Sequence, residues 1–180
     1  MKITILAGTN RPGSQTLRVA RVFEKKYQAL GAQTTLLDLQ ELPAELFRPE
    51  AYAQKPASFA RFNDAVLNCD GLLVVTPEYN GGFPGVLKLF IDHLKFPESF
   101  ERRAVAFVGL AAGMWGALRP VEQLEAIFRY RNAFLFNERI FLPRIEGQLD
   151  AQDAFTSPDI AKLADSQTRN FLEFCRRLKV

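Results

Sequence analysis

Residues 8–16, GTNRPGSQT, place several hydrogen-bond donors and one cation directly after an apolar run. The hydroxyl groups of Thr9, Ser14 and Thr16 and the guanidinium of Arg11 all stand where a helix is expected to begin. A helix N-terminus favours anions through its free amides and its dipole, and charged donors strengthen such contacts. This set of donors predicts a site for a terminal phosphate monoester.

A plainer interpretation of the same loop is that one hydroxyl only caps the following helix while Arg11 points into water. Capping by serine or threonine is common, so one hydroxyl alone would carry little weight. Two other phosphate loops are excluded by the residues present. The loop lacks the glycine-lysine-serine/threonine ending of a P-loop, and it lacks the three-glycine fingerprint of an ordinary NAD site.

A second unusual loop lies in residues 76–94, TPEYNGGFPGVLKLFIDHL. Tyr79 offers an aromatic ring beside two glycines, Gly81 and Gly82, and glycine allows a ligand to approach the backbone closely. Pro84 suits the first position of the next helix. A strand-to-helix turn would explain the glycines but not this mixture of rigid, aromatic and flexible residues. We therefore expect a flat ligand to lie against this loop.

A third loop, residues 109–120, is small and apolar and carries the only tryptophan of the chain, Trp115. Such a loop could line one edge of a flat aromatic ligand, or it could pack against a second subunit. Both interpretations remain open at this point.

Apolar runs alternate with helical patterns along the chain, and they predict the strands and helices that position these loops. Strands are expected at residues 2–8, 33–39, 71–77 and 103–111 and once within 133–142; helices are expected at 16–30, 56–68, 84–94, 119–130 and 158–178. Residues 40–56 form a surface connection. This alternation predicts a doubly wound parallel α/β sheet of five strands, in one domain spanning residues 1–180. Ligands bind at the carboxyl ends of the strands in such sheets.

The composition narrows the classes of function. The net charge is +3, and the basic residues occur singly or in pairs rather than as the stripe typical of nucleic-acid binders. Cys69 and Cys175, both placed on predicted helices, have neither metal-ligand nor disulfide-framework spacing. No uncharged stretch is long enough to span a bilayer, and Met1 leads directly into a strand. These features predict a cytoplasmic protein.

The two loop motifs resemble those of the NADPH-dependent FMN reductase family, a flavodoxin-like group that includes quinone, azo-dye and chromate reductases. GTNRPGS matches the first-loop pattern of the family, and PEYNGGFPGVLKLFID matches its second loop and the helix that follows. The resemblance implies a flavodoxin-like strand order of 2-1-3-4-5. In the third loop, Ala117 replaces the second glycine of the usual pair.

The resemblance also implies which residues bind the cofactor. The FMN phosphate would contact Thr9, Arg11, Ser14, Gln15 and Thr16; the isoalloxazine edge would contact Pro77, Glu78, Tyr79, Asn80 and Gly81; the third loop would contribute Gly113 and Gly116. No catalytic side chain or metal is expected, because the cofactor carries the redox chemistry. His93, inside the third predicted helix, is expected to pack or to make a local hydrogen bond.

The resemblance implies NADPH as the electron donor and a small-molecule acceptor such as free flavin, a quinone, an azo compound or chromate. It also implies a homodimer or homotetramer. The alternatives are a flavodoxin-type electron carrier and a flavin-binding regulatory protein without activity. A sequence pI near 9.0 and the cation at Arg11 count against the electron carrier.

Overall fold

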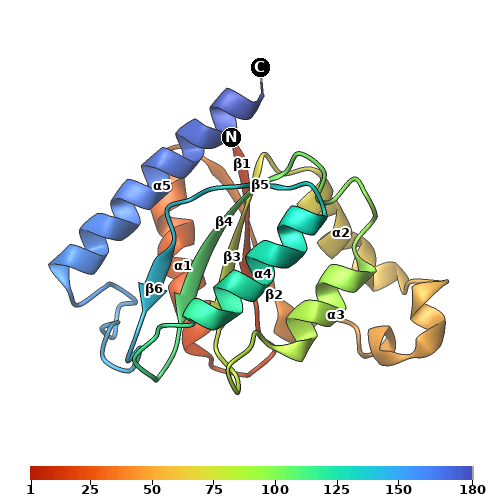
Figure 1. Cartoon of the computed structure of the whole chain (residues 1–180), viewed down its shortest axis with the longest axis horizontal. Coiled ribbons are helices and arrows are strands. Elements are labelled where there is room, and N and C mark those ends of the chain that lie inside the picture. Colours follow the sequence, from red (N-terminus) through yellow and green to blue (C-terminus); the bar gives the residue numbers. More distant parts are fainter. Residues whose placement is uncertain (180) are drawn as a thin grey trace.

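A parallel sheet lies at the centre of the computed structural model, which describes residues 1–179 (Figure 1). Its strands are β1 Lys2–Ala7, β2 Gln33–Asp38, β3 Gly71–Pro77, β4 Ala104–Leu110, β5 Phe134–Leu135 and β6 Ile140–Leu142. The order is β2-β1-β3-β4-β5, with β6 also paired to β4, and every pairing is parallel. The predicted strand order is confirmed.

The described residues form five α-helices, which cover the two faces of this sheet (Figure 1). They are α1 Gln15–Ala29, α2 Ala60–Leu67, α3 Gly85–His93, α4 Leu118–Tyr130 and α5 Pro158–Leu178. Side chains of α1 and α5 pack on one face, and side chains of α2, α3 and α4 pack on the other. Both faces are therefore closed to water, which explains why β3 and β4 contain only one polar side chain, Thr76, and are buried along their whole length.

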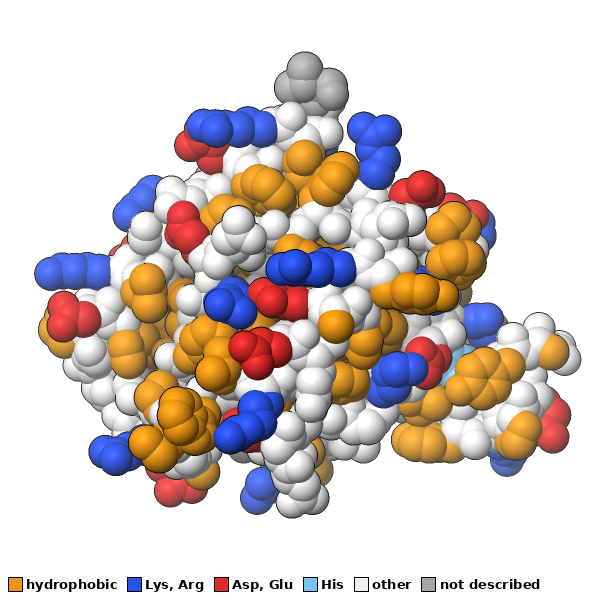
Figure 2. Space-filling model, in the orientation of Figure 1, with side chains coloured by type: hydrophobic (Ala, Val, Ile, Leu, Met, Phe, Trp, Pro, Cys, Tyr) orange, Lys and Arg blue, Asp and Glu red, His pale blue; other side chains and the backbone are white. Residues whose placement is uncertain are grey.

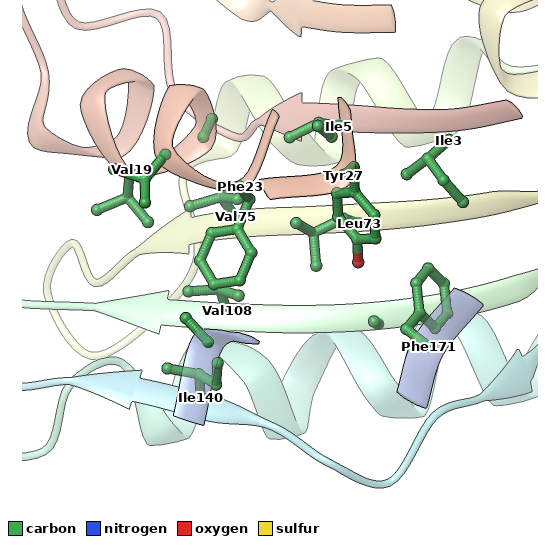
Figure 3. Packing of buried hydrophobic residues seen from close by; sticks show 14 of the residues in the cluster. Ile3, Ile5, Val19, Phe23, Tyr27, Leu73, Val75, Val108, Ile140 and Phe171 are labelled. Atoms are coloured by element: carbon green, nitrogen blue, oxygen red, sulfur yellow. The ribbon is translucent and has the colours of Figure 1, made fainter. Parts of the chain in front are cut away.

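The core between the sheet and helices α1 and α5 is built from branched aliphatic and aromatic side chains (Figure 3). Ile5, Leu73 and Val108 come from three neighbouring strands, and Phe23 from α1 and Phe171 from α5 add aromatic rings to the same cluster. Burying one such side chain stabilises the fold by roughly 1.5–3 kcal/mol. This layer holds the strands rigidly and so fixes the loops at their ends.

The fifth strand position differs from the prediction of one strand within residues 133–142. Two short strands, β5 and β6, occupy it, and the polar residues 137–139 lie between them. The sheet formed by residues 1–179 therefore has six strands rather than five. The side chain of Gln167 on α5 lies in this gap. Its Nε2 donates hydrogen bonds to the carbonyl oxygens of Phe107 (3.2 Å) and Glu138 (2.6 Å). A side-chain amide thus replaces part of the missing backbone ladder.

Two further predictions need correction in the segment that precedes β3. The helix expected at 56–68 begins as a short 3₁₀ turn at Ala57–Phe59 and becomes α-helical only at Ala60. Cys69 lies in the loop after α2 and not on a helix. Residues 40–56 do form a surface connection, which contains the short turns Ala44–Phe47 and Pro49–Tyr52.

Both cysteines are buried free thiols, Cys69 beside β3 and Cys175 on α5. Burial raises the pKa of Cys69, and burial raises the pKa of Cys175 to about 12. A thiol reacts as its thiolate, so a raised pKa makes both groups poor nucleophiles near neutral pH. Neither cysteine has the chemistry of a reactive or redox-sensing group.

The phenol of Tyr27 on α1 leads to a prediction about stability. Its Oη is buried and has no hydrogen-bond partner among the described residues, and burial raises its pKa well above the usual value. Because an unpaired buried polar group is unfavourable, Tyr27→Phe should raise the free energy of unfolding by about 1 kcal/mol.

Urea unfolding measures this change, with Tyr130→Phe as the control because Tyr130 is 83% exposed. The control should stay within about 0.5 kcal/mol of the wild type. A clear loss of stability in Tyr27→Phe would show that the phenol has a favourable partner.

Candidate functional site

The three unusual loops meet at one edge of the sheet, the carboxyl ends of β1, β3 and β4, seen at the lower edge of Figure 1. Gly8 brings the first loop against β3, because its N–H donates to Val75 O at 2.8 Å. A Cβ atom on Gly8 would lie 2.9 Å from that same oxygen, so only glycine fits there. The convergence expected from the sequence is present.

The first loop turns its polar groups toward the beginning of α1. Ser14 is the N-cap, and its Oγ accepts a hydrogen bond from Leu17 N–H at 3.2 Å. Capping uses the oxygen of Ser14 as an acceptor and leaves its proton free to donate, so the capping and phosphate interpretations are compatible. Thr16 is buried in the first turn, and its hydroxyl makes no hydrogen bond to the described residues. The Gln15 side chain instead accepts from Arg18 at 3.0 Å.

The two arginines near this loop are in different electrostatic situations. The Arg18 guanidinium is fully engaged, with Nε 2.6 Å from an Asp153 carboxylate oxygen and a second nitrogen 2.6 Å from Asp150 O. Arg11 is exposed and forms no ion pair within residues 1–179. An unpaired cation beside a helix N-terminus is suited to bind an anionic ligand.

The second loop is held by a tight two-residue turn at Asn80-Gly81. Tyr79 and Gly82 exchange backbone hydrogen bonds of 2.8 and 3.1 Å across it. Asn80 and Gly81 have φ values of 53° and 77°, and positive values at both central positions are the signature of a type I′ turn, which Asn-Gly favours. The glycine that allows close approach of a ligand is thus also required by the turn. Pro77, the last residue of β3, is buried opposite Leu110.

Glu78 and Arg119 form an ion pair that the sequence analysis did not predict. A carboxylate oxygen of Glu78 lies 3.7 Å from a guanidinium nitrogen of Arg119, in the first turn of α4. The Arg119 guanidinium also lies over the Trp115 ring, 5.9 Å from its centroid. Arg119 is largely exposed, so the pair contributes at most about 1 kcal/mol. It directs the Glu78 carboxylate toward α4.

The third loop combines an exposed tip with a buried base. Met114 and Trp115 are exposed, as is Gly113, whose carbonyl accepts from Arg144 N–H at 3.1 Å. Gly116 is buried with a φ of +56°, and a Cβ there would lie 2.8 Å from Leu142 N. Ala117, which replaces a glycine of the family pattern, is buried and has a φ of +67°. Gly116 therefore has a packing function, and its contact with a cofactor stays a prediction.

Side-chain hydrogen bonds join the second loop to its neighbours on both sides. Thr9 Oγ1 and Tyr79 Oη lie 2.8 Å apart, which links the first and second loops. On the other side, Gln123 Nε2 on α4 donates to Gly81 O at 3.4 Å. The sequence does not single out Gln123 or Arg119, because their only signal is that they lie at the end of the third loop or just after it.

Ionisable groups outside the loops have structural contacts. His93 is buried, and its Nδ1 lies 2.9 Å from Leu89 O, which confirms the predicted local hydrogen bond. Its ring packs 4.5 Å from that of Tyr52, in the surface connection. Asp92 pairs with Lys88 at 2.7 Å. Within residues 1–179, no group of three His, Cys, Asp or Glu side chains could hold a metal ion.

The site can therefore bind a ligand that is anionic at one end and flat at the other. The unpaired cation of Arg11, the free hydroxyl of Thr16 and the N-terminal amides of α1 suit a phosphate. The glycine-containing turn and the exposed ring of Tyr79 suit a planar group. FMN has both parts, and the donors fit it.

Comparisons with known proteins agree with this chemistry. A family model described as NADPH-dependent FMN reductase matches residues 1–145. A NAD(P)H-dependent FMN reductase of Pseudomonas aeruginosa is 28% identical over 153 residues, which cover 83% of this chain and 82% of that protein. A quinone reductase of Escherichia coli is 27% identical over 188 residues, covering 100% of this chain and 98% of that protein.

Among solved structures, the flavoenzyme NAD(P)H:(acceptor) oxidoreductase FerB of Paracoccus denitrificans has the same fold. Its TM-score is 0.84 at 21% identity, and the match covers 98% of this chain and 97% of that one.

Proposed function

Because the chain belongs to the NADPH-dependent FMN reductase family, we propose that it binds FMN at the three loops and passes electrons from NAD(P)H to a small-molecule acceptor. One observation carries this proposal. Arg11, which has no ion-pair partner among the described residues, lies in the loop just before α1, and that loop meets the turn at Asn80-Gly81. When bound, FMN would supply the redox chemistry between the nicotinamide donor and the acceptor.

The residues of the chain bind and orient the cofactor in this proposal. The phosphate is held by the first loop and the start of α1, through Thr9, Arg11, Ser14, Gln15 and Thr16. The second loop, Pro77 to Gly81, lies along the isoalloxazine edge. Because Glu78 is directed toward Arg119, its contribution to the cofactor is through its main chain rather than its carboxylate. Gly113 borders the ring from the third loop, and Gly116 supports that loop from beneath.

The acceptor would approach the flavin beside the tip of the third loop, where Met114 and Trp115 are exposed. An exposed indole suits stacking on a planar aromatic acceptor. Relatives named quinone reductase and azoreductase act on acceptors of this kind. We therefore place quinones and azo compounds first in an acceptor screen, ahead of free flavin and chromate.

We also propose a homodimer or homotetramer that acts in the cytoplasm. The segment around the 3₁₀ turns at residues 44–52 projects from the body (Figure 1), and hydrophobic side chains are visible on the surface of this projection (Figure 2). Phe47 and Tyr52 in this segment are exposed. Exposed apolar groups of this size are typical of contacts between proteins. No helix within residues 1–179 is long and apolar enough to cross a membrane. Light scattering after size-exclusion chromatography measures the number of subunits.

The visible spectrum of the FMN-loaded protein, recorded without oxygen, tests the proposed function. Addition of NADPH should bleach the flavin absorbance within the mixing time of a hand experiment, and a quinone should restore it. A flavin spectrum that persists after NADPH and after NADH would indicate an electron carrier or a regulatory protein. A protein that retains no FMN would contradict the proposal.

A further inference from the structure

The contact between the hydroxyl groups of Thr9 and Tyr79 joins two of the residues that are predicted to bind the cofactor. Thr9 is 1% exposed and follows β1, and Tyr79 is 37% exposed and follows β3. Their hydroxyl oxygens lie 2.8 Å apart. The backbone of Tyr79 is fixed by its two hydrogen bonds with Gly82, so the phenol is held in place by a rigid turn.

The hydrogen bonds of the Thr9 hydroxyl can be counted. A hydroxyl donates one hydrogen bond and accepts two. The backbone N–H of Arg11 lies 3.3 Å from Thr9 Oγ1, and an N–H can only donate, so it occupies one acceptor position. The contact with Tyr79 then has two forms. In one form, Tyr79 donates to Thr9 and fills the second acceptor position of Thr9. In the other form, Thr9 donates to Tyr79, and the Thr9 proton is then not free for another hydrogen bond.

A phosphate beside Thr9 selects between these two forms, because a phosphate dianion only accepts hydrogen bonds. If Thr9 donated to Tyr79, its oxygen would present a lone pair to the anion, and the two would repel. If Tyr79 donates to Thr9, the single proton of Thr9 is free for the phosphate. Among the described residues, Tyr79 Oη and the backbone N–H of Arg11 are the two groups within hydrogen-bond distance of Thr9 Oγ1. Chains of hydrogen bonds also polarise one another, which strengthens the last bond.

We propose that Tyr79 is a positioning residue for the FMN phosphate, which acts by donating its hydroxyl proton to Thr9 Oγ1 and so turning the Thr9 proton toward the phosphate. The proposal rests on the proposed function, since it concerns the same cofactor. It assigns the Tyr79 hydroxyl to the phosphate end of the site, whereas the family resemblance implies only that this residue lies along the isoalloxazine edge. The first and second loops then hold the cofactor as one hydrogen-bonded unit.

Removing the Tyr79 hydroxyl should therefore act on FMN and spare riboflavin, which lacks the phosphate. We expect Tyr79→Phe to weaken FMN binding about fivefold, the effect of one ordinary hydrogen bond, and riboflavin binding less than twofold. The ring itself stays in place in this variant, so its packing against the flavin is unchanged. The binding of each flavin to apoprotein is measured by quenching of flavin fluorescence, with no turnover required.

A double-mutant cycle with Thr9→Val tests whether Tyr79 acts through Thr9. Valine keeps the shape of threonine and removes its hydroxyl, so Tyr79→Phe should weaken FMN binding less than twofold in the Thr9→Val background. In a Thr9→Ser background, which keeps the hydroxyl, the fivefold effect should return. Tyr130→Phe is the matched control, because Tyr130 is exposed on α4 away from the loops.

The outcomes separate this inference from the proposed function. A wild-type protein that binds neither flavin overturns both. A wild type that binds FMN, together with equal losses for FMN and riboflavin in Tyr79→Phe, overturns only the phosphate assignment. A full fivefold effect of Tyr79→Phe in the Thr9→Val background overturns the relay and assigns the phenol a direct contact. Thermal melting of each apoprotein confirms that the variants compared are folded.

Discussion

Arg11→Ala should weaken FMN binding by about 1.5–3 kcal/mol, the range for hydrogen bonds to charged groups, and should change riboflavin binding far less. The reason is that the Arg11 guanidinium is exposed and has no carboxylate partner within residues 1–179. Its removal therefore breaks no internal ion pair, and the interaction that is lost is the one with the FMN phosphate. Calorimetry or flavin fluorescence titration with both ligands measures the difference.

Arg21→Ala is the matched control, because Arg21 lies on α1, the helix that follows the first loop, is exposed and carries the same charge as Arg11. Both variants lower the net charge by one, so a general electrostatic effect would weaken FMN binding similarly in both. We expect only Arg11→Ala to discriminate against the phosphate. The difference between the two variants should persist at high salt better than a long-range effect would, since charges in contact are screened less. Equal losses for FMN and riboflavin in Arg11→Ala would refute the assignment.

Gly116→Ala should lower the free energy of unfolding by about 2–5 kcal/mol. Two causes add. A non-glycine residue at a φ of +56° is strained by about 1–2 kcal/mol. The new Cβ would also lie 2.8 Å from Leu142 N and 2.9 Å from Pro143 N, and relieving such overpacking costs about 1–3 kcal/mol. Chemical denaturation of the apoprotein measures the change.

Gly113→Ala is the control in the same loop. A Cβ atom on Gly113 meets no other atom within 4 Å, so the free energy of unfolding should stay within about 1 kcal/mol of the wild type. Equal free energies of unfolding for the two alanine variants would contradict the close approach of the third loop to β6. If Gly116→Ala folds at low temperature, its FMN affinity shows separately whether this glycine touches the cofactor.

Much of the fold follows from local pattern. Residues 71–77 and 103–111 contain apolar runs without alternation, and both became central strands because helices cover the two faces of the sheet. The α5 helix begins at Pro158 and ends at Leu178 as its periodicity predicts. The division between β5 and β6 could not be predicted locally, because the group that fills the gap, Gln167, comes from a helix about thirty residues later.

The candidate site was predictable as a set of loops but not as a set of contacts. Hydroxyls, Arg11 and the Asn80-Gly81 pair are visible as residue types at particular spacings. The hydrogen bond between Thr9 and Tyr79 joins positions 70 residues apart, and the pair of Glu78 with Arg119 crosses from one loop to the next helix. Such partners depend on strand order and on loop geometry, so they need three-dimensional coordinates.

The Gln167 side chain gives the last helix an importance that its position outside the matched residues 1–145 would not suggest. Because its amide hydrogen-bonds to Phe107 O on β4 and to Glu138 O between β5 and β6, α5 cannot detach without uncovering the edge of the sheet. The helix and that edge should therefore open together as one cooperative unit. In native-state hydrogen exchange, the amides of β6 and of the middle of α5 should share one opening free energy. In a chain shortened before α5, the amides of β6 should lose their protection from exchange.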